Sequence, residues 1–208
     1  MEKTLLIGLT GKYCAGKNYV AQLLEEHSLP VLDVDKLGHR VLEQEKDRVA
    51  GRFGRDILDA EGHINRRLLG ERVFGQKDEL KALEDLIHPG VNRETQEWVQ
   101  VQKTRACVIN AALLHRSSVF SSLSAIILVE AGLITRMVRA KKRDKLPYSA
   151  LMHRFKSQED FTPQYFIGKS DIYRVENSGF IGPGHQSRQR KLRIRIEEIL
   201  SLLGLCRV

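Results

Sequence analysis

The amino-acid sequence predicts an α/β fold in which a parallel sheet is covered by helices on both faces. Short apolar runs alternate along the chain with longer segments whose apolar residues recur at helical spacing. Strands that are short, continuously apolar and separated by helices are typical of parallel sheets buried on both sides. Of the 208 residues, 42% are hydrophobic and 29% are charged. This composition excludes a disordered chain, and the length allows one domain with a smaller insertion.

Five segments are expected to form the strands. The first, Leu5–Leu9, is a short apolar run that ends in a glycine-containing turn, and the second, Pro30–Asp35, is acidic at its end. Further strands are expected over Ala106–Asn110, Ala125–Val129 and Ile172–Val175. None of these runs approaches the roughly 18–20 apolar residues that a membrane-spanning helix needs. No membrane association is expected.

Helices are expected between these strands. The spacing of Val20, Leu23 and Leu24 predicts a helix that starts at Lys17 and is closed by Pro30. Other helical segments are expected over 37–45, over 52–86 with a turn at 59–62, from a start near Pro89, and over 141–158. Residues 179–189 are expected to form a loop before a final helix that ends near Gly204. The apolar face of that helix is formed by Ile194, Ile196, Ile199, Leu200, Leu202 and Leu203.

The whole chain, 1–208, is thus expected to be a single sheet domain, with residues from about 46 to 100 forming a small helical insertion. Its 34 Lys and Arg against 26 Asp and Glu give a formal charge of +8, which favours anionic partners. Nucleic acid is not expected as a partner, because aromatic residues are only 6% and no zinc-finger or helix-turn-helix signature is found. The cysteines (Cys14, Cys107 and Cys206) are odd in number and far apart, as expected for reduced thiols in a cytoplasmic protein.

The strongest motif is Gly11–Asn18, which follows the first strand and precedes the first helix. It fits the phosphate-binding template G-x-x-x-x-G-K-[S/T] at Gly11, Gly16 and Lys17. Its glycines and the following helix N-terminus would let backbone amides approach phosphate oxygens, and Lys17 would lie among the β- and γ-phosphates. Asn18 stands where a Ser or Thr hydroxyl normally contacts Mg²⁺, and an amide oxygen there would have a different reach.

Two carboxylates, Asp33 and Asp35, stand at the end of the second strand. In open α/β sheets the carboxyl ends of the strands face the ligand crevice. Asp33 is expected to accept a proton from an acceptor hydroxyl or to bind metal. For Asp35, a structural role as the N-cap of the next helix is equally open.

The segments Gly8–Ala21 and Leu32–Asp35 resemble the dephospho-coenzyme A kinase family. The resemblance continues in order through Phe53-Gly54, Ile57–Gly62, Asn65-Arg66, Leu69, Val73-Phe74, Leu83-Glu84, Ile87–Pro89, Arg143-Asp144, Arg154, Gln158 and Asn177–Gly179. It implies a P-loop kinase with a lid near 139–160 and an acceptor-binding insertion near 46–100. It also implies transfer of the ATP γ-phosphate to the ribose 3′-hydroxyl of dephospho-coenzyme A, the last step of coenzyme A biosynthesis.

The resemblance assigns roles to individual residues. ATP would be bound by Gly11, Lys12, Tyr13, Cys14, Ala15, Gly16, Lys17, Asn18, Tyr19, Arg143 and Asn177. Asp33, Lys17 and Arg143 would be the catalytic residues, with Arg154 as a further lid cation, and Asn18 and Asp33 would hold Mg²⁺. Asp33, Arg66 and His88 would face the acceptor. Structural alternatives stay open: a surface ion pair for Arg66, a boundary between two helices for His88, and a solvated basic face for Arg143.

The chain departs from the family pattern around the expected metal site. Asn18, Asn110 and Arg116 replace a hydroxyl and two acids, so negative charge that could support Mg²⁺ is missing. A nucleotide- or coenzyme A-binding homologue with weakened catalysis is therefore an alternative. A related small-molecule P-loop kinase is another.

Overall fold

The computed structural model describes residues 4–156, 171–179 and 185–205. It divides into two compact units, residues 1–32 with 102–208, and residues 33–101. A sheet with the strand order β2-β3-β1-β4-β5 organises the first unit. Its strands are β1 (Leu5–Gly11), β2 (Val31–Asp33), β3 (Ala106–Asn110), β4 (Ala125–Glu130) and β5 (Asp171–Glu176). The expected α/β fold with a parallel sheet is confirmed.

The register of the central strands is set by β1, which pairs in parallel with both neighbours. Leu9 pairs with Asn110 of β3 and with Ile127 of β4. The strands β4 and β5 continue the parallel sheet from Ala125↔Asp171 to Glu130↔Glu176. All of β3 and nearly all of β1 and β4 are buried, which explains why the sequence shows continuous apolar runs rather than alternation.

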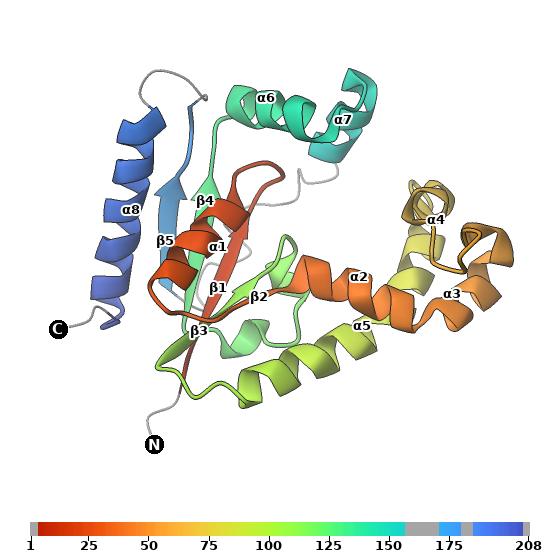
Figure 1. Ribbon diagram of the computed structural model, residues 1–208, viewed down its shortest axis with the longest axis horizontal. Helices are drawn as coiled ribbons and strands as arrows, with labels where there is room; N and C mark the ends of the chain where they lie inside the picture. The colour runs from red at the N-terminus through yellow and green to blue at the C-terminus, as the bar shows by residue number, and fades with distance from the viewer. Residues whose placement is uncertain (1–3, 157–170, 180–184, 206–208) are drawn as a thin grey trace. The chain divides into compact units, whose positions relative to one another are not determined.

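Two helices, α1 (Lys17–Glu26) and α8 (His185–Leu202), cover one face of this sheet (Figure 1). Val20, Leu23 and Leu24 of α1 share one buried cluster with Ile196 and Ile199 of α8. On the other face, Gly8 lies against the 3₁₀ helix η2 (Leu114–Arg116), and a Cβ at Gly8 would come within 2.5 Å of Leu114 Cδ2. A second 3₁₀ helix, η3 (Phe120–Ser122), leads into β4.

The second unit is helical and has its own core. It consists of α2 (Val34–Gln44), α3 (Lys46–Phe53), the 3₁₀ helix η1 (Arg55–Ile57), α4 (Arg66–Val73) and α5 (Lys77–Gln100). Val49, Phe53 and Ile57 are buried together with residues of α4. Helix α5 approaches α2 closely at Gly90, where a Cβ would lie 2.7 Å from Val41 Cγ1.

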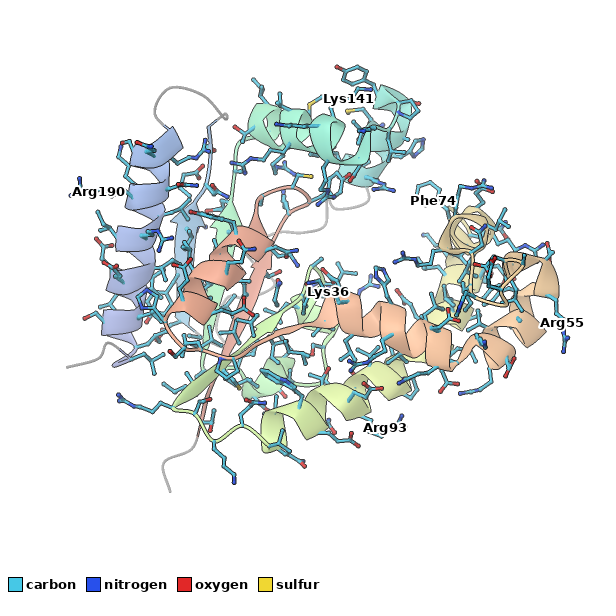
Figure 2. The ribbon with its side chains drawn as sticks, in the orientation of Figure 1. Lys36, Arg55, Phe74, Arg93, Lys141 and Arg190 are labelled. Carbon is cyan, nitrogen blue, oxygen red and sulfur yellow. The ribbon has the colours of Figure 1, made fainter. Side chains whose placement is uncertain are left out.

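Two sequence-based expectations about helix boundaries are wrong. Pro89 lies inside α5 rather than in the first turn of a new helix, so His88 marks no boundary between helices. The expected helix over 141–158 is instead α6 (Leu133–Asp144) followed by α7 (Tyr148–Lys156), with 157 and 158 outside the described residues. Lys145 ends α6 in the left-handed region, at φ 54°. Lys141 bridges this break by donating to the Leu146 carbonyl over 2.9 Å (Figure 2).

The C-terminal segment also differs from expectation at its start. Helix α8 begins at His185, inside the expected loop 179–189, of which 180–184 lie outside the described residues. On its expected apolar face, Ile194 and Leu202 are 45% and 68% exposed. Within the described ranges, no helix combines the length and apolar character needed to cross a membrane.

Candidate active site

The phosphate-loop motif forms the turn between β1 and α1. Gly11 is the last residue of β1, and Lys17 is the first residue of α1. Between them the chain reverses through Cys14, at φ 60°, and Gly16, at φ 99°. The Ala15 amide donates to the Lys12 carbonyl over 2.9 Å. The strand, turn and helix that the motif requires are therefore all present.

Each glycine of the motif is required for a separate steric reason. A Cβ at Gly11 would lie 2.4 Å from the backbone oxygen of Val129 on β4. At Gly16 the backbone is left-handed, and a Cβ would lie 2.2 Å from Asn177 Nδ2. The motif predicts glycine at these positions because backbone amides must approach phosphate oxygens closely. In the structure, Val129 and Asn177 also leave no room for a Cβ at these two positions.

The side chains of Arg139 and Asn177 donate hydrogen bonds to a carbonyl of the loop. Arg139 of α6 donates to the Ala15 carbonyl over 3.1 Å and to the Asn177 carbonyl over 2.7 Å. The buried amide of Asn177, just after β5, donates to the same Ala15 oxygen over 2.9 Å. In a trans peptide the carbonyl and the following N–H point in opposite directions, so the Gly16 N–H points away from Arg139. With the first N–H groups of α1, it forms a site suited to an anion.

Asn18 faces Asn110, which ends β3. Asn110 Nδ2 donates to Asn18 Oδ1 over 3.2 Å. Asn110 is 1% exposed, and its Oδ1 is buried without a hydrogen-bond partner. An orphaned carbonyl oxygen of this kind is a hard ligand suited to Mg²⁺ or to a water bound to it. Both residues are neutral, and Arg116 is exposed at the end of η2.

Arg143 lies in a charged cluster at the end of α6. Its Nε donates to Asp144 Oδ1 over 2.8 Å, and its guanidinium lies 5.0 Å from the centre of the Tyr13 ring. Arg154 of α7 donates to Asp144 Oδ2 over 3.1 Å. The Arg143 guanidinium holds the pKa of Asp144 below its usual value. Burial, reinforced by the bond to Asp144, raises the pKa of Tyr13.

Cys14, beside Tyr13, is half-buried against the α6–α7 pair. Burial raises the pKa of its thiol, although arginines such as Arg143 oppose this shift. A protonated, partly buried thiol is a weak nucleophile. The structure thus places Cys14 in packing contact with the α6–α7 pair.

In the second unit, Asp33 is the N-cap of α2 at the end of β2. Its Oδ1 accepts a hydrogen bond from the Lys36 amide over 3.1 Å, and its Oδ2 lies 3.7 Å from Lys36 Nζ (Figure 2). The sequence-based alternative that Asp35 caps this helix is wrong, because α2 already begins at Val34 and Asp35 lies in its first turn. The second strand therefore ends at Asp33.

The other two residues expected to face the acceptor, Arg66 and His88, lie on helices of the second unit. Arg66 begins α4, and its Nη1 lies 3.0 Å from His39 Nδ1 on α2. Because arginine can only donate, His39 Nδ1 must be the acceptor, with the ring proton on Nε2. His88 is exposed in the middle of α5.

One residue of this site has no role predicted from the sequence. Arg139 stands at the start of the expected lid near 139–160, but its bonds to the loop were not predicted. Asn177 is expected to bind ATP, and in the structure its amide donates to the Ala15 carbonyl of the loop. Only the tertiary arrangement brings α6, the end of β5 and the loop together, since these segments are far apart in the sequence.

The sheet and the phosphate loop define a P-loop nucleotide-binding protein of the small-molecule kinase class. The family model for dephospho-CoA kinase matches residues 5–168. A dephospho-CoA kinase from Halalkalibacterium halodurans is 31% identical over 160 residues, which cover 74% of this chain and 80% of the relative. The chain therefore belongs to the dephospho-CoA kinase family, and the expected resemblance, kinase class and function are confirmed.

Solved structures agree with this fold. The crystal structure of TT1252 from Thermus thermophilus has a TM-score of 0.76 and 27% identity, covering 95% of this chain and 99% of that one. A dephospho-CoA kinase from Campylobacter jejuni has a TM-score of 0.62 at 22% identity, covering 95% and 98%. At that identity the second likeness supports the fold alone.

Proposed function

We propose that this protein transfers the γ-phosphate of ATP to the ribose 3′-hydroxyl of dephospho-coenzyme A, with the phosphate loop and Lys17 binding the triphosphate. The observation that carries the proposal is the loop held from behind by Arg139 and Asn177. The Ala15 carbonyl is bonded from within the protein, so the Gly16 amide and the N-terminus of α1 are oriented to bind an anion. The dephospho-CoA kinase family supplies the identity of the acceptor.

Charge neutralisation is the main task of this site. Phosphoryl transfer needs little covalent chemistry from the protein, and charge spreads over the oxygens of the transferred group. Lys17, at the start of α1, supplies one cation beside the loop. Arg143 and Arg154, which share Asp144, supply further positive charge from α6 and α7.

Asp33 is the proposed base for the acceptor hydroxyl. It ends β2, and the carboxyl ends of parallel strands form the ligand-binding edge of such sheets. One of its oxygens caps α2, which fixes the orientation of the carboxylate, and the other, 3.7 Å from Lys36 Nζ, is the proposed proton acceptor. Arg66 and His88 are the proposed contacts with the acceptor.

Mg²⁺ is the proposed metal, and the residues at the loop fit it. Asn18 and Asn110 offer amide oxygens, one of them buried and unpartnered. Mg²⁺ binds through a few protein oxygens together with phosphates and waters. It would neutralise charge on the β- and γ-phosphates, while Asn18 and Asn110 orient its ligands without adding charge. Asp33 is the proposed source of a carboxylate for it.

A cytoplasmic location is also proposed. Cys14 and Cys107 are free thiols in the structure, and thiols remain reduced in the cytosol.

The test is an ADP-release assay with dephospho-coenzyme A, with the product identified by mass spectrometry. Lys17→Ala and Asp33→Asn should each lower kcat more than about tenfold. Asparagine caps helices as well as aspartate does, so Asp33→Asn removes the base and keeps the cap. Asp85→Asn, at an exposed i,i+4 pair with Lys81, is the matched control and should leave kcat unchanged.

The neutral Asn18–Asn110 pair favours a second candidate, a homologue that binds nucleotide with weakened catalysis. Tight ATP binding without product in either Mg²⁺ or Mn²⁺ would support this candidate. A 3′-phosphorylated product formed in step with ADP would exclude it.

A further inference from the structure

The tip of the phosphate loop carries a tyrosine that is inserted between two helices. Tyr13 belongs to the small core formed by Ala140 of α6 with Leu151 and Phe155 of α7. Its ring meets Phe155 edge to face, with ring centres 5.4 Å apart and an interplanar angle of 79°. The loop that would bind phosphate and the helices that carry the proposed lid arginines are therefore packed together at this point.

Asp144 is the hub of the polar contacts around that ring. Its side chain is only 16% exposed. It accepts a hydrogen bond from the Tyr13 hydroxyl, two from Arg143, at 2.8 and 3.3 Å, and one at 3.1 Å from Arg154. One carboxylate thus orients both guanidiniums, and the tyrosine hydroxyl helps to hold it.

The aromatic ring adds a second constraint on the same cations. The guanidinium carbons of Arg143 and Arg154 lie 5.0 and 5.9 Å from the centre of the Tyr13 ring. These distances allow cation–π attraction, which fixes the plane of a guanidinium as well as its position. Arg143 and Arg154 are otherwise 60% and 49% exposed, so without these contacts both long side chains would sample many rotamers.

We propose that Tyr13 and Asp144 are positioning residues, which link the phosphate loop to Arg143 and Arg154 and pre-orient these arginines for the transferring phosphate. The inference rests on the proposed function and extends it to the side chains of Tyr13 and Asp144, which contact the two arginines. Packing alone does not need the hydroxyl, because phenylalanine would fill the same space. Pre-organised donors contribute to catalysis since they need not reorganise during the reaction.

The direct test is Tyr13→Phe, which removes the hydroxyl and keeps the ring. We expect kcat to fall about tenfold while KM for ATP stays within about twofold, because the arginines act on charge that develops in the transition state. Asp144→Asn should have the same signature. Tyr148→Phe is the matched control: this tyrosine lies on α7, is 63% exposed and packs on Lys141, and its variant should keep both constants.

A double-mutant cycle separates positioning from packing. If Tyr13 acts through Arg143 and Arg154, then Tyr13→Phe should have no further effect on kcat in a background in which both arginines are replaced by alanine. Additive losses, a loss of thermal stability with unchanged kcat, or a rise in kcat would each overturn the inference.

A binding measurement keeps the inference distinct from the proposed function. If the unaltered protein transfers no phosphate, the proposed function fails by itself. Tyr13→Phe should still weaken the binding of ADP with aluminium fluoride, a mimic of the transferring phosphate, more than it weakens the binding of ADP alone. Equal weakening of the two would overturn the inference.

Discussion

The backbone conformation of single phosphate-loop residues is set by contacts with the rest of the protein, as well as by the need to bind phosphate. Gly16 combines a left-handed backbone with close contact to Asn177. Cys14 adopts a left-handed conformation without being glycine, at a cost of about 1–2 kcal/mol. Its side chain packs against the α6–α7 core. The loop thus keeps the strand, turn and helix of its motif, although a residue other than glycine adopts a left-handed conformation at its tip.

Substitution of Gly16 distinguishes the effect of its left-handed backbone from the effect of its close contact with Asn177. Gly16→Ala should destabilise the protein by at least about 2 kcal/mol more than Gly62→Ala, because a displaced Asn177 adds to the backbone strain. Gly62 is the matched control: its φ is 78°, but a Cβ there would meet nothing within 4 Å. Urea unfolding measures both losses, and equal losses would contradict the role of Asn177.

The neutral Asn18–Asn110 pair should weaken the coupling between metal and nucleotide. Neither amide repels the phosphates when Mg²⁺ is absent, so ATP affinity should change little between EDTA and Mg²⁺. Asn110→Asp should raise the ratio of these two affinities about tenfold or more, because the new carboxylate repels metal-free ATP and attracts Mg²⁺. Calorimetry measures the ratio, with Asn92→Asp on α5 as the charge control. An unchanged ratio would place the metal elsewhere.

At the scale of elements, the strands were predictable and several helix boundaries were not. Buried parallel strands leave continuous apolar runs, which is why β3 was predicted with its observed bounds. Pro89 favours a helix start when judged locally. In the structure its missing N–H only removes the bond to the Asp85 carbonyl, and Gly90 allows α5 to pack on α2. Tertiary packing overrides the local signal there.

The candidate site likewise has a part that the sequence predicts and a part that it does not. The loop Gly11–Lys17 was predictable because its geometry is local to one strand, turn and helix. The role of Arg139 was not, since its partners Ala15 and Asn177 lie 124 and 38 positions away. From the sequence, Asp33 is expected to act as a base or metal ligand. The capping hydrogen bond from Lys36 is not predicted, because the helix is expected to begin later, at residue 37. Contacts at long sequence separation leave no periodic signal.

Arg139 of α6 bonds to the phosphate loop and to the segment after β5. Its substitution should therefore weaken the contacts that hold the loop. Arg139→Lys replaces a planar fork with a single ammonium, which cannot reach the carbonyls of Ala15 and Asn177 together. We expect about 1–2 kcal/mol lower stability and about tenfold weaker ATP binding, measured by urea unfolding and calorimetry. Arg193→Lys, at an exposed pair with Glu26, should change neither. Unchanged ATP binding in Arg139→Lys would show that the loop holds its own shape.

Strand β3 carries a group that should make stability depend on alkaline pH. Burial raises the pKa of Cys107 to about 11 from an ordinary value of 9.0. The neutral thiol therefore favours folding fully below pH 9, and this contribution is lost as the pH rises toward 11. The loss can reach about 1.4 kcal/mol per pH unit. Cys107→Ala should be less stable at pH 8 yet lose less stability between pH 8 and 10.5. Parallel urea-unfolding curves for the two proteins over this range would contradict the assignment.

At the scale of the whole molecule, the two units divide the proposed work. The first unit contains the sheet, the phosphate loop and the arginines of α6 and α7, while the second has a separate core around Val49, Phe53 and Ile57. A change at a proposed acceptor contact of the second unit should therefore affect the acceptor and leave nucleotide binding alone.

Arg66 allows this division to be tested. Arg66→Ala should raise KM for dephospho-coenzyme A about tenfold, because a guanidinium is suited to an anionic acceptor, and should leave the Kd for ATP unchanged. Arg67→Ala is the control: Arg67 is the next residue of α4, exposed and paired with Glu71 over 2.5 Å, and its loss should change neither constant. Steady-state kinetics with varied acceptor and calorimetry with ATP measure the two effects separately. If Arg66→Ala weakens ATP binding instead, the second unit contributes to the nucleotide site and the division of labour is wrong.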